Sequence, residues 1–182
     1  KELINIRKEV LKKDDLFFAL KGENFNGNIF AQQAIELGAA YAIVDEEISF
    51  NSSKIIKVNN VLQTLQALAK HHREQFTTMP NGRQVPFIAI TGSNGKTTSK
   101  ELINCVLATK FNTLCTIGNL NNHIGVPLTL LSFNQETQIG IVEMGANHQK
   151  EIEFLCEIAQ PDFGYITNFG KAHLEGFGGV EG

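Results

Sequence analysis

Short apolar runs and helical patterns alternate along the first part of the chain. Three segments are typical of β-strands, namely LFFAL, YAIVD and KIIKV at residues 16–20, 41–45 and 54–58. Residues 29–37 (IFAQQAIEL) space their apolar side chains as a helix does, and Gly38 is placed to end that helix. A second helix is predicted to begin near Asn59 or Asn60 and to run into the polar segment HHREQF.

The segment TTMPNGRQVP, at residues 77–86, interrupts this pattern with two prolines and an Asn-Gly pair. It predicts a boundary between two α/β domains, residues 1–80 and 81–182. After it, apolar runs alternate with helical patterns, which indicates a mostly parallel sheet. The predicted strands are PFIAI, NTLCT, QIGIVE and FGYIT, and the predicted helices include TSKELINCVLATK and KEIEFLCEIA.

Each predicted strand of the second domain is followed by a polar or glycine-rich segment. These segments are TGSNGKTT, IGNLNN, EMGANH and NFGKAH. In an open parallel sheet, ligands bind outside the carboxyl ends of the strands, so we expect the functional residues in these four segments.

The first of them has the strand, glycine turn and helix arrangement of a phosphate-binding loop. Backbone N–H groups and the positive end of a helix dipole converge on an anion there. Lys96 is expected to face the terminal phosphates of a nucleoside triphosphate, and the Thr97 hydroxyl to bind a magnesium ion. The longer G-x-x-x-x-G-K-[ST] pattern is not met, because Ile90 occupies its first glycine position. The loop itself does not decide between ATP and GTP.

Three further sets of side chains are candidates from their positions alone. Glu143 ends the run IGIVE, where a carboxylate can complete the oxygen ligands of a hard cation or simply be solvated. His173 follows the last strand and is either a metal ligand or phosphate donor, or a solvated loop residue. Amides in GNLNNHIGVP can donate to phosphate oxygens or serve only as turn residues, and these are Asn119, Asn121 and Asn122.

Composition excludes several classes of function. The net charge is −3 with both signs interspersed, so we expect no nucleic-acid partner. No apolar run approaches the roughly 20 residues that a membrane-spanning helix needs, and the first residues do not resemble a signal peptide. We expect a cytosolic protein. Its three cysteines lie in apolar runs and are predicted to be buried, reduced thiols, namely Cys105, Cys115 and Cys156.

Beyond these patterns, the chain resembles the Mur ligases of peptidoglycan synthesis over nearly all of its length. TGSNGKTT resembles the shortened phosphate loop that Mur ligases share with folylpolyglutamate synthases. The segments GNLNNHIGVPLTLL, VEMGANHQKEI and ITNFGKAHLEGFGG resemble the branch of the family that adds D-alanyl-D-alanine to a UDP-muramoyl-tripeptide. Residues 14–46 are similar to the uridine-nucleotide-binding domain of that branch.

The resemblance implies ATP and Mg²⁺ as cofactors and gives roles to individual residues. It implies a triphosphate cradle, with Asn119 and Asn122 beside it, formed by Gly92, Ser93, Asn94, Gly95, Lys96, Thr97 and Thr98. Lys96, Glu143 and His173 become the catalytic residues, and Thr97, Glu143 and His173 the magnesium ligands. The UDP-substrate contacts become Arg7, Asn26 and Asn28, although Asn5-Ile6-Arg7 and Asn26-Gly27-Asn28 depart from the family's usual Asp-Ser/Thr-Arg and Asp-Gly-His.

It further implies a monomeric enzyme of three domains, of which this sequence holds the first and part of the second. We therefore expect the chain alone to bind nucleotide weakly and to turn over nothing. Two alternatives remain at this stage. One is another ligase of the superfamily, either of a different Mur step or a folate-adding enzyme, and the folate-adding enzyme would lack the uridine-binding module. The other is a nucleotide-binding switch protein without ligase activity.

Overall fold

The computed structural model describes residues 11–77, 82 and 84–170. The chain divides into two compact units, Lys1–Leu65 and Gln66–Gly182, and helix α2 (Val61–Glu74) runs through this division. The functional boundary between residues 80 and 81 stays a prediction, because a division by contacts does not test it. No helix among the described residues is long and apolar enough to cross a membrane.

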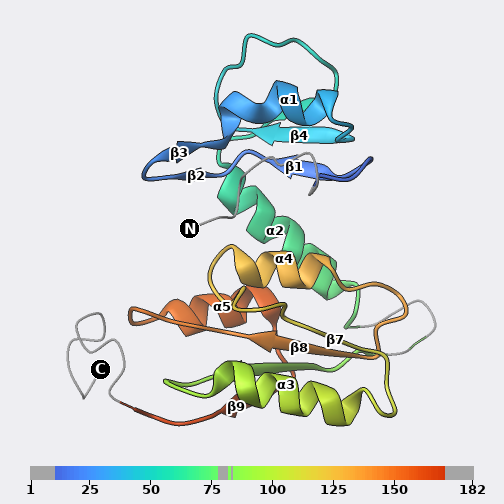
Figure 1. Cartoon of the computed structure of the whole chain (residues 1–182), viewed down its shortest axis with the longest axis vertical. Helices are drawn as coiled ribbons and strands as arrows, with labels where there is room; N and C mark the ends of the chain where they lie inside the picture. Colours follow the sequence, from blue (N-terminus) through green and yellow to red (C-terminus); the bar gives the residue numbers. More distant parts are fainter. Residues whose placement is uncertain (1–10, 78–81, 83, 171–182) are drawn as a thin grey trace. The chain divides into compact units, whose positions relative to one another are not determined.

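The first unit is built around a three-stranded parallel sheet (Figure 1). Its order is β1-β4-β5, formed by Leu16–Phe18, Tyr41–Val44 and Ile55–Lys57. The three strands predicted from the sequence are thereby confirmed. A short antiparallel pair lies between β1 and the first helical segment, formed by β2 (Lys21–Gly22) and β3 (Phe25–Asn26). A 3₁₀ turn, η1 (Gly27–Phe30), then leads into α1 (Ala31–Glu36).

The second unit has a four-stranded sheet in the order β7-β8-β6-β9, and every strand pair in it is parallel. Its strands in chain order are β6 (Phe87–Thr91), β7 (Thr113–Cys115), β8 (Ile139–Glu143) and β9 (Phe163–Ile166). Besides α2, its helices are α3 (Lys96–Leu107), α4 (Gly125–Leu131) and α5 (Glu151–Ala159). The predicted α/β class with mostly parallel strands is confirmed.

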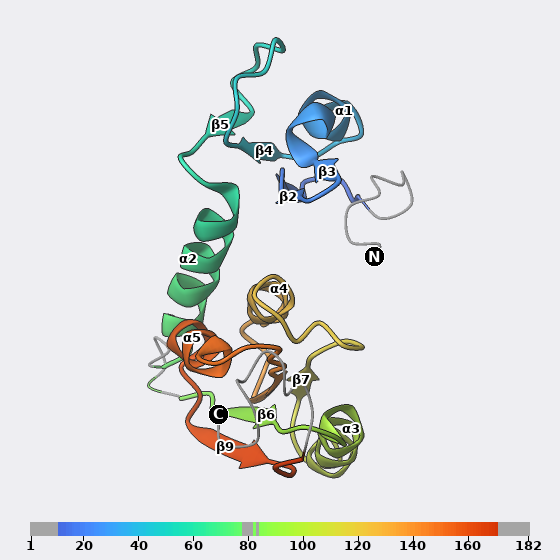
Figure 2. The ribbon, with the colours of Figure 1, turned by 90° about the vertical axis from the view of Figure 1, so that its left-hand side faces the viewer.

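Helices cover both faces of this sheet (Figure 2). On one face, Ile103 and Leu107 of α3 pack against Ile90 and Ile141. On the other face, α2, α4 and α5 contribute to a larger apolar core that contains Phe87. A layered parallel sheet of this kind places the carboxyl ends of β6, β7 and β8 at one edge, which is where the candidate site lies.

A buried arginine connects the end of α2 to the segment between α5 and β9. The guanidinium of Arg73 donates from Nε to the carbonyl oxygen of Ala159 at 3.0 Å and from Nη2 to that of Gln160 at 2.8 Å. It also pairs with Asp162 at 3.0 Å and stacks 3.9 Å from the centroid of the Phe87 ring. Burial lowers the pKa of Arg73, and the charge of Asp162 opposes that effect.

Two of the differences from the sequence-based expectation concern helix α4 and the cysteines. Helix α4 was not predicted, because Gly125 and Pro127 both disfavour a helix interior. They are tolerated here since they lie in the first turn. The prediction of three buried cysteines is wrong for Cys105, which is exposed. Helix α3 carries more apolar residues than its sheet-facing side can bury, and Leu102 and Val106 are also exposed. Cys115 and Cys156 are partly buried, and burial raises the pKa of both thiols.

Candidate functional site

A four-residue turn connects the end of β6 to the first residue of α3, Lys96. Two of its residues adopt the left-handed backbone that favours glycine, Gly92 at φ +127° and Gly95 at φ +78°. A Cβ atom at Gly92 would also lie only 2.2 Å from the hydroxyl oxygen of Thr167. The tight turn therefore depends on glycine at position 92, both for its backbone angle and for the close approach of the segment that follows β9 (Phe163–Ile166).

The ammonium group of Lys96 is folded back over this turn. Its Nζ donates to the carbonyl oxygens of Gly92 at 2.7 Å and Ser93 at 3.4 Å, and the residue is half-buried. The positive charge thus lies beside the N-terminus of α3, where the first N–H groups of a helix are free to bind an anion. This arrangement can bind the phosphates of a nucleotide.

The turn is held from outside by the segment that follows β9. The Asn168 side chain accepts a hydrogen bond from the Asn94 N–H at 3.2 Å and donates to the Asn94 carbonyl at 3.1 Å. The Thr167 hydroxyl donates to the same carbonyl at 2.6 Å. Ser93 is bound twice to Gly170, through its hydroxyl as donor and as acceptor. The loop is therefore preorganised before any ligand arrives.

Glu143 ends the neighbouring strand β8 and points at the start of α3. Its carboxylate accepts from the Thr97 hydroxyl at 2.9 Å and from the Asn121 amide at 2.8 Å. The residue is only 1% exposed, so its charge is surrounded by protein. A hydroxyl and a carboxylate that meet at the phosphate loop are the oxygen ligands that Mg²⁺ prefers.

The three side chains of the asparagine segment lie in different environments. Asn121 contacts Glu143, as described above. The Asn122 side chain instead accepts the N–H groups of Ile124 at 3.0 Å and Gly125 at 2.8 Å, and so caps α4. Asn119 is exposed. The family pattern had singled out Asn119 and Asn122. No spacing rule predicts the contact between Asn121 and Glu143, because it arises from the packing of a loop against the end of strand β8.

A cavity of about 580 Å³ opens beside these groups. Lys96, Asn121 and Asn122 line one part of it, and the turn between β8 and α5 lines another, including Asn147, His148 and Glu151. The N–H groups of Asn147 and His148 both donate to the Glu151 carboxylate, which lowers the pKa of Glu151. This cavity can accept a polar ligand that extends away from the phosphate loop.

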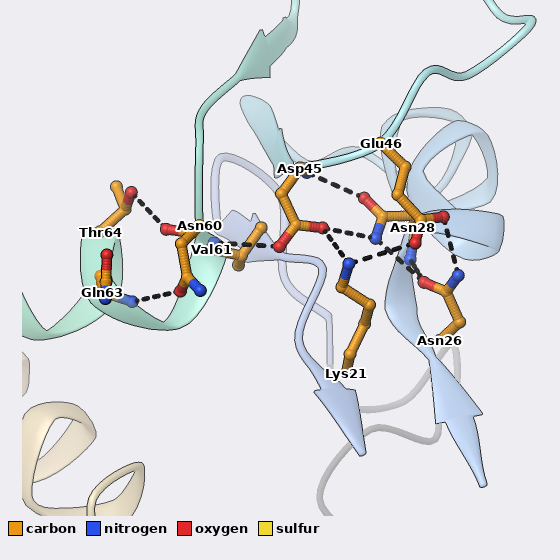
Figure 3. Close-up of polar contacts among 9 residues, drawn as sticks. All are labelled: Lys21, Asn26, Asn28, Asp45, Glu46, Asn60, Val61, Gln63 and Thr64. Carbon is orange, nitrogen blue, oxygen red and sulfur yellow. Dashed lines mark hydrogen bonds and ion pairs between the residues drawn. The ribbon is translucent and has the colours of Figure 1, made fainter. Parts of the chain in front are cut away.

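A second polar cluster lies in the first unit and contains the predicted substrate contacts Asn26 and Asn28 (Figure 3). The Asn26 oxygen caps η1 by accepting the Asn28 N–H at 3.0 Å, and its amide donates to Glu46 at 2.8 Å. Asn28 is 2% exposed and exchanges hydrogen bonds with both the side chain and the backbone of Asp45. Lys21 pairs with Asp45 at 3.0 Å and with Glu46 at 3.1 Å.

Electrostatics stabilises the charged forms in this cluster. Burial alone would raise the pKa of Asp45, but hydrogen bonds from Asn28, Lys21 and the Val61 N–H together lower it. The Asn26 amide, followed by Lys21, lowers the pKa of Glu46. Hydrogen bonds to the two carboxylates raise the pKa of Lys21. Sequence reasoning missed Lys21, Asp45 and Glu46, although Asp45 is the last residue of a predicted strand, which is the signal that could have identified it.

Two of the predicted site residues, Arg7 and His173, lie outside the described residues. Within the described part of the chain, no group of three or more His, Cys, Asp or Glu side chains is arranged to hold a metal ion. Thr97 and Glu143 are therefore the two predicted metal ligands whose contacts the structure describes. Thr98 is exposed on the first turn of α3.

Two models of known protein families match the sequence, one in each half of the chain. The family model described as Mur ligase middle domain matches residues 90–182, and that described as Mur ligase family, catalytic domain, matches residues 4–73. The UDP-N-acetylmuramoyl-tripeptide--D-alanyl-D-alanine ligase of Bacillus subtilis is 40% identical over 174 residues, which are 94% of this chain and 36% of that protein. The Haemophilus influenzae enzyme of the same name is 41% identical over 185 residues, covering 100% and 39%.

Solved structures give the same assignment. A crystal structure of MurF from Acinetobacter baumannii superposes with a TM-score of 0.85 and 39% identity, over 96% of this chain and 37% of that one. MurF ligase from Thermotoga maritima in complex with ADP gives a TM-score of 0.83 and 34% identity, over 97% and 40%. The chain thus spans little more than a third of the length of these relatives. With one family model matching the second half of its sequence and another most of the first, this chain belongs to the Mur ligase family.

Proposed function

We propose that this chain is part of an ATP-dependent ligase that adds D-alanyl-D-alanine to UDP-N-acetylmuramoyl-tripeptide in peptidoglycan precursor synthesis. The observation that carries the proposal is the meeting of Lys96, Thr97 and Glu143 at the carboxyl ends of β6 and β8. The names of the relatives described above support the choice of substrates.

In the proposed reaction, the terminal carboxylate of the tripeptide attacks the γ-phosphorus of ATP and releases ADP. The amine of D-alanyl-D-alanine then attacks the resulting acyl phosphate, loses a proton and expels inorganic phosphate. The chemistry needs a positioned phosphoryl group and compensating charge more than a protein nucleophile. Lys96 supplies a positive charge at the loop, and the first turn of α3 supplies N–H groups that have no partner within the helix.

The residues at the loop fit a magnesium ion. Glu143 is a buried carboxylate whose contacts at the phosphate loop include a hydroxyl group, and a cavity lined by Lys96 and Asn121 lies beside it. Thr97 and Glu143 would hold the ion, with His173 as a further proposed ligand. When bound, the ion would neutralise charge on the phosphoryl group. Asn121 and Thr97 orient the carboxylate for that task.

We further propose that the two domains bind different ligands. The first, residues 1–80, binds the uridine end of the substrate, and the second, residues 81–182, binds ATP. Arg7, Asn26 and Asn28 remain the proposed contacts of the first domain. The hydrogen bonds of Asn28 are used within the cluster, which favours a role in positioning its neighbours. Lys21 and Asn26 are more exposed and better suited to touch a diphosphate. The enzyme is proposed to act in the cytoplasm, where ATP is available, and as a monomer.

Isothermal titration of the chain with ATP and Mg²⁺ tests the nucleotide site. The Lys96→Met variant is expected to bind MgATP at least tenfold more weakly, about 1.4 kcal/mol, because the charge facing the phosphates is lost. Lys70→Met is a matched control, since Lys70 is exposed on α2 and the change in charge is the same. Equal affinities for all three proteins would contradict the proposed role of Lys96.

A second titration separates the substrate classes. The chain is expected to bind UDP-N-acetylmuramoyl-tripeptide and not a folate. Binding of the folate alone would indicate a folate-adding ligase. Binding of nucleotide without either substrate would favour the regulatory alternative.

A further inference from the structure

Helix α3 contains a second lysine, Lys100, one turn after Lys96. Its side chain is completely buried, with 0% exposure, and so cannot touch a nucleotide directly. A buried ammonium group is costly unless its protons are paired. The proposed reaction gives Lys100 no role, although its ammonium group lies close to the Glu143 carboxylate.

The ammonium group of Lys100 is bound from several sides. Its Nζ donates to the carbonyl oxygens of Thr116 at 2.6 Å and Gly118 at 3.0 Å. It pairs with the Glu101 carboxylate at 2.9 Å and lies 3.9 Å from Oε2 of Glu143. One cation thus connects helix α3 with the segment after β7 and with the carboxylate at the end of β8.

That segment is attached to Glu143 at two further points. The Glu143 N–H donates to the Thr116 hydroxyl at 2.9 Å, and the Asn121 amide donates to the Glu143 carboxylate at 2.8 Å. Lys100 therefore closes a ring of contacts that begins at α3, passes along residues 116–121 and returns through Glu143 to the Thr97 hydroxyl. Of these groups, only the Glu143 carboxylate and the Thr97 hydroxyl face the phosphate loop.

We propose that Lys100 is a positioning residue for the phosphate and cation site. Its ammonium group fixes residues 116–121 so that Asn121 reaches Glu143, and its charge holds the carboxylate at the loop beside Thr97. The part that concerns the cation rests on the proposed function. The part that concerns the segment rests on the contacts of Lys100 alone.

Two substitutions separate these tasks. Lys100→Met removes both the donors and the charge, whereas Lys100→Gln keeps two N–H donors for the Thr116 and Gly118 carbonyls and removes the charge. Hydrogen exchange of the ligand-free chain is the first measurement. Lys100→Met is expected to speed exchange of the amides at residues 117–121 at least tenfold, Lys100→Gln by less, and neither to change exchange in β6.

The second measurement is the factor by which Mg²⁺ tightens ATP binding, obtained from titrations with Mg²⁺ and with excess chelator. Both substitutions are expected to reduce this factor at least threefold, while binding of ATP in chelator changes less. A purely structural role would weaken both titrations alike. The matched control is again Lys70→Met, which should alter neither measurement.

Each outcome decides the inference. Unchanged exchange at residues 117–121 in Lys100→Met, or equal acceleration across the whole sheet, would overturn it. An unchanged Mg²⁺ factor in a folded Lys100→Gln protein would overturn the role of the charge. If the unsubstituted chain binds no ATP, the proposed function fails while the exchange measurement still tests Lys100. If neither variant folds, Lys100 is a folding residue and the positioning role is wrong.

Discussion

At the scale of single residues, the candidate site brings together a few side chains whose positions follow from where the strands end. Lys96, Thr97 and Glu143 were predictable because a glycine turn after one strand and a carboxylate after its neighbour meet at one edge of a parallel sheet. Asn121 was a candidate only as an amide that could donate to phosphate oxygens, and its contact with Glu143 was not predicted. Lys100 was not a candidate, because its partners are distant in sequence and a helical lysine is usually solvated.

The residue-scale prediction concerns Gly92. Gly92→Ala is expected to destabilise the second unit by about 2–4 kcal/mol, because the backbone is left-handed and the added methyl group meets Thr167. It should also abolish detectable binding of MgATP. Urea denaturation and titration measure the two effects. Gly164→Ala is the control, since no atom lies within 4 Å of the Cβ position in β9. Equal stability of the two variants would show that the turn tolerates a side chain.

At the scale of elements, strands were the most predictable part. All seven of the strands predicted from sequence form, and they differ from their predicted bounds by only one or two residues at an end. Helix α4 was not predicted, because Gly125 and Pro127 weaken the helical pattern and the spacing of apolar residues does not show that Asn122 caps the helix. The two-residue strands β2 and β3 are too short for any alternation to show.

The element-scale prediction concerns Asp45, whose hydrogen bonds connect the end of β4 with η1 and with the start of α2. The pKa values of Asp45 and Glu46 are lowered, so their contribution to stability is present above about pH 4 and lost as the pH falls below it. The pKa of Lys21 is raised, so its contribution to stability is lost as the pH rises, and only at strongly alkaline pH.

We therefore expect the melting temperature of the first unit to be constant from about pH 5 to 9 and to fall below about pH 4. Asp45→Asn should lower the plateau and flatten the acidic decrease, because the lost carboxylate accepts the Val61 N–H and the Lys21 ammonium. Circular dichroism melts across this range measure both. Glu36→Gln on α1 is the control for removing one carboxylate. An acidic decrease as steep in Asp45→Asn as in the unsubstituted chain would contradict this role.

At the scale of the whole molecule, the fold is two α/β units whose main sheets are parallel, and the family relationship accounts for both. The most exposed strand of the second unit is β9. In the described part of the chain it pairs with β6 on one side only, and all four of its residues are exposed. An exposed edge strand with aromatic side chains is a template for pairing between molecules.

The chain is therefore expected to self-associate reversibly at high concentration, and Tyr165→Lys to reduce that association, because a charge on an edge strand opposes strand pairing. Sedimentation velocity over a range of concentrations measures this. Tyr41→Lys makes the same change at an exposed tyrosine of a central strand and serves as the control. Identical sedimentation of the Tyr165→Lys protein and the unsubstituted chain would rule out the edge as the contact.

The bracing of the phosphate loop by the segment after β9 has a consequence for synthesis of the protein. Asn94 and its partner Asn168 are 74 positions apart, so a ribosome must add many further residues after the loop has left the exit tunnel before the loop can be held in place. During that interval the nascent chain carries the complete motif but not its tertiary support. The proposed nucleotide site is thus completed late, after strand β9 has emerged and docked against β6.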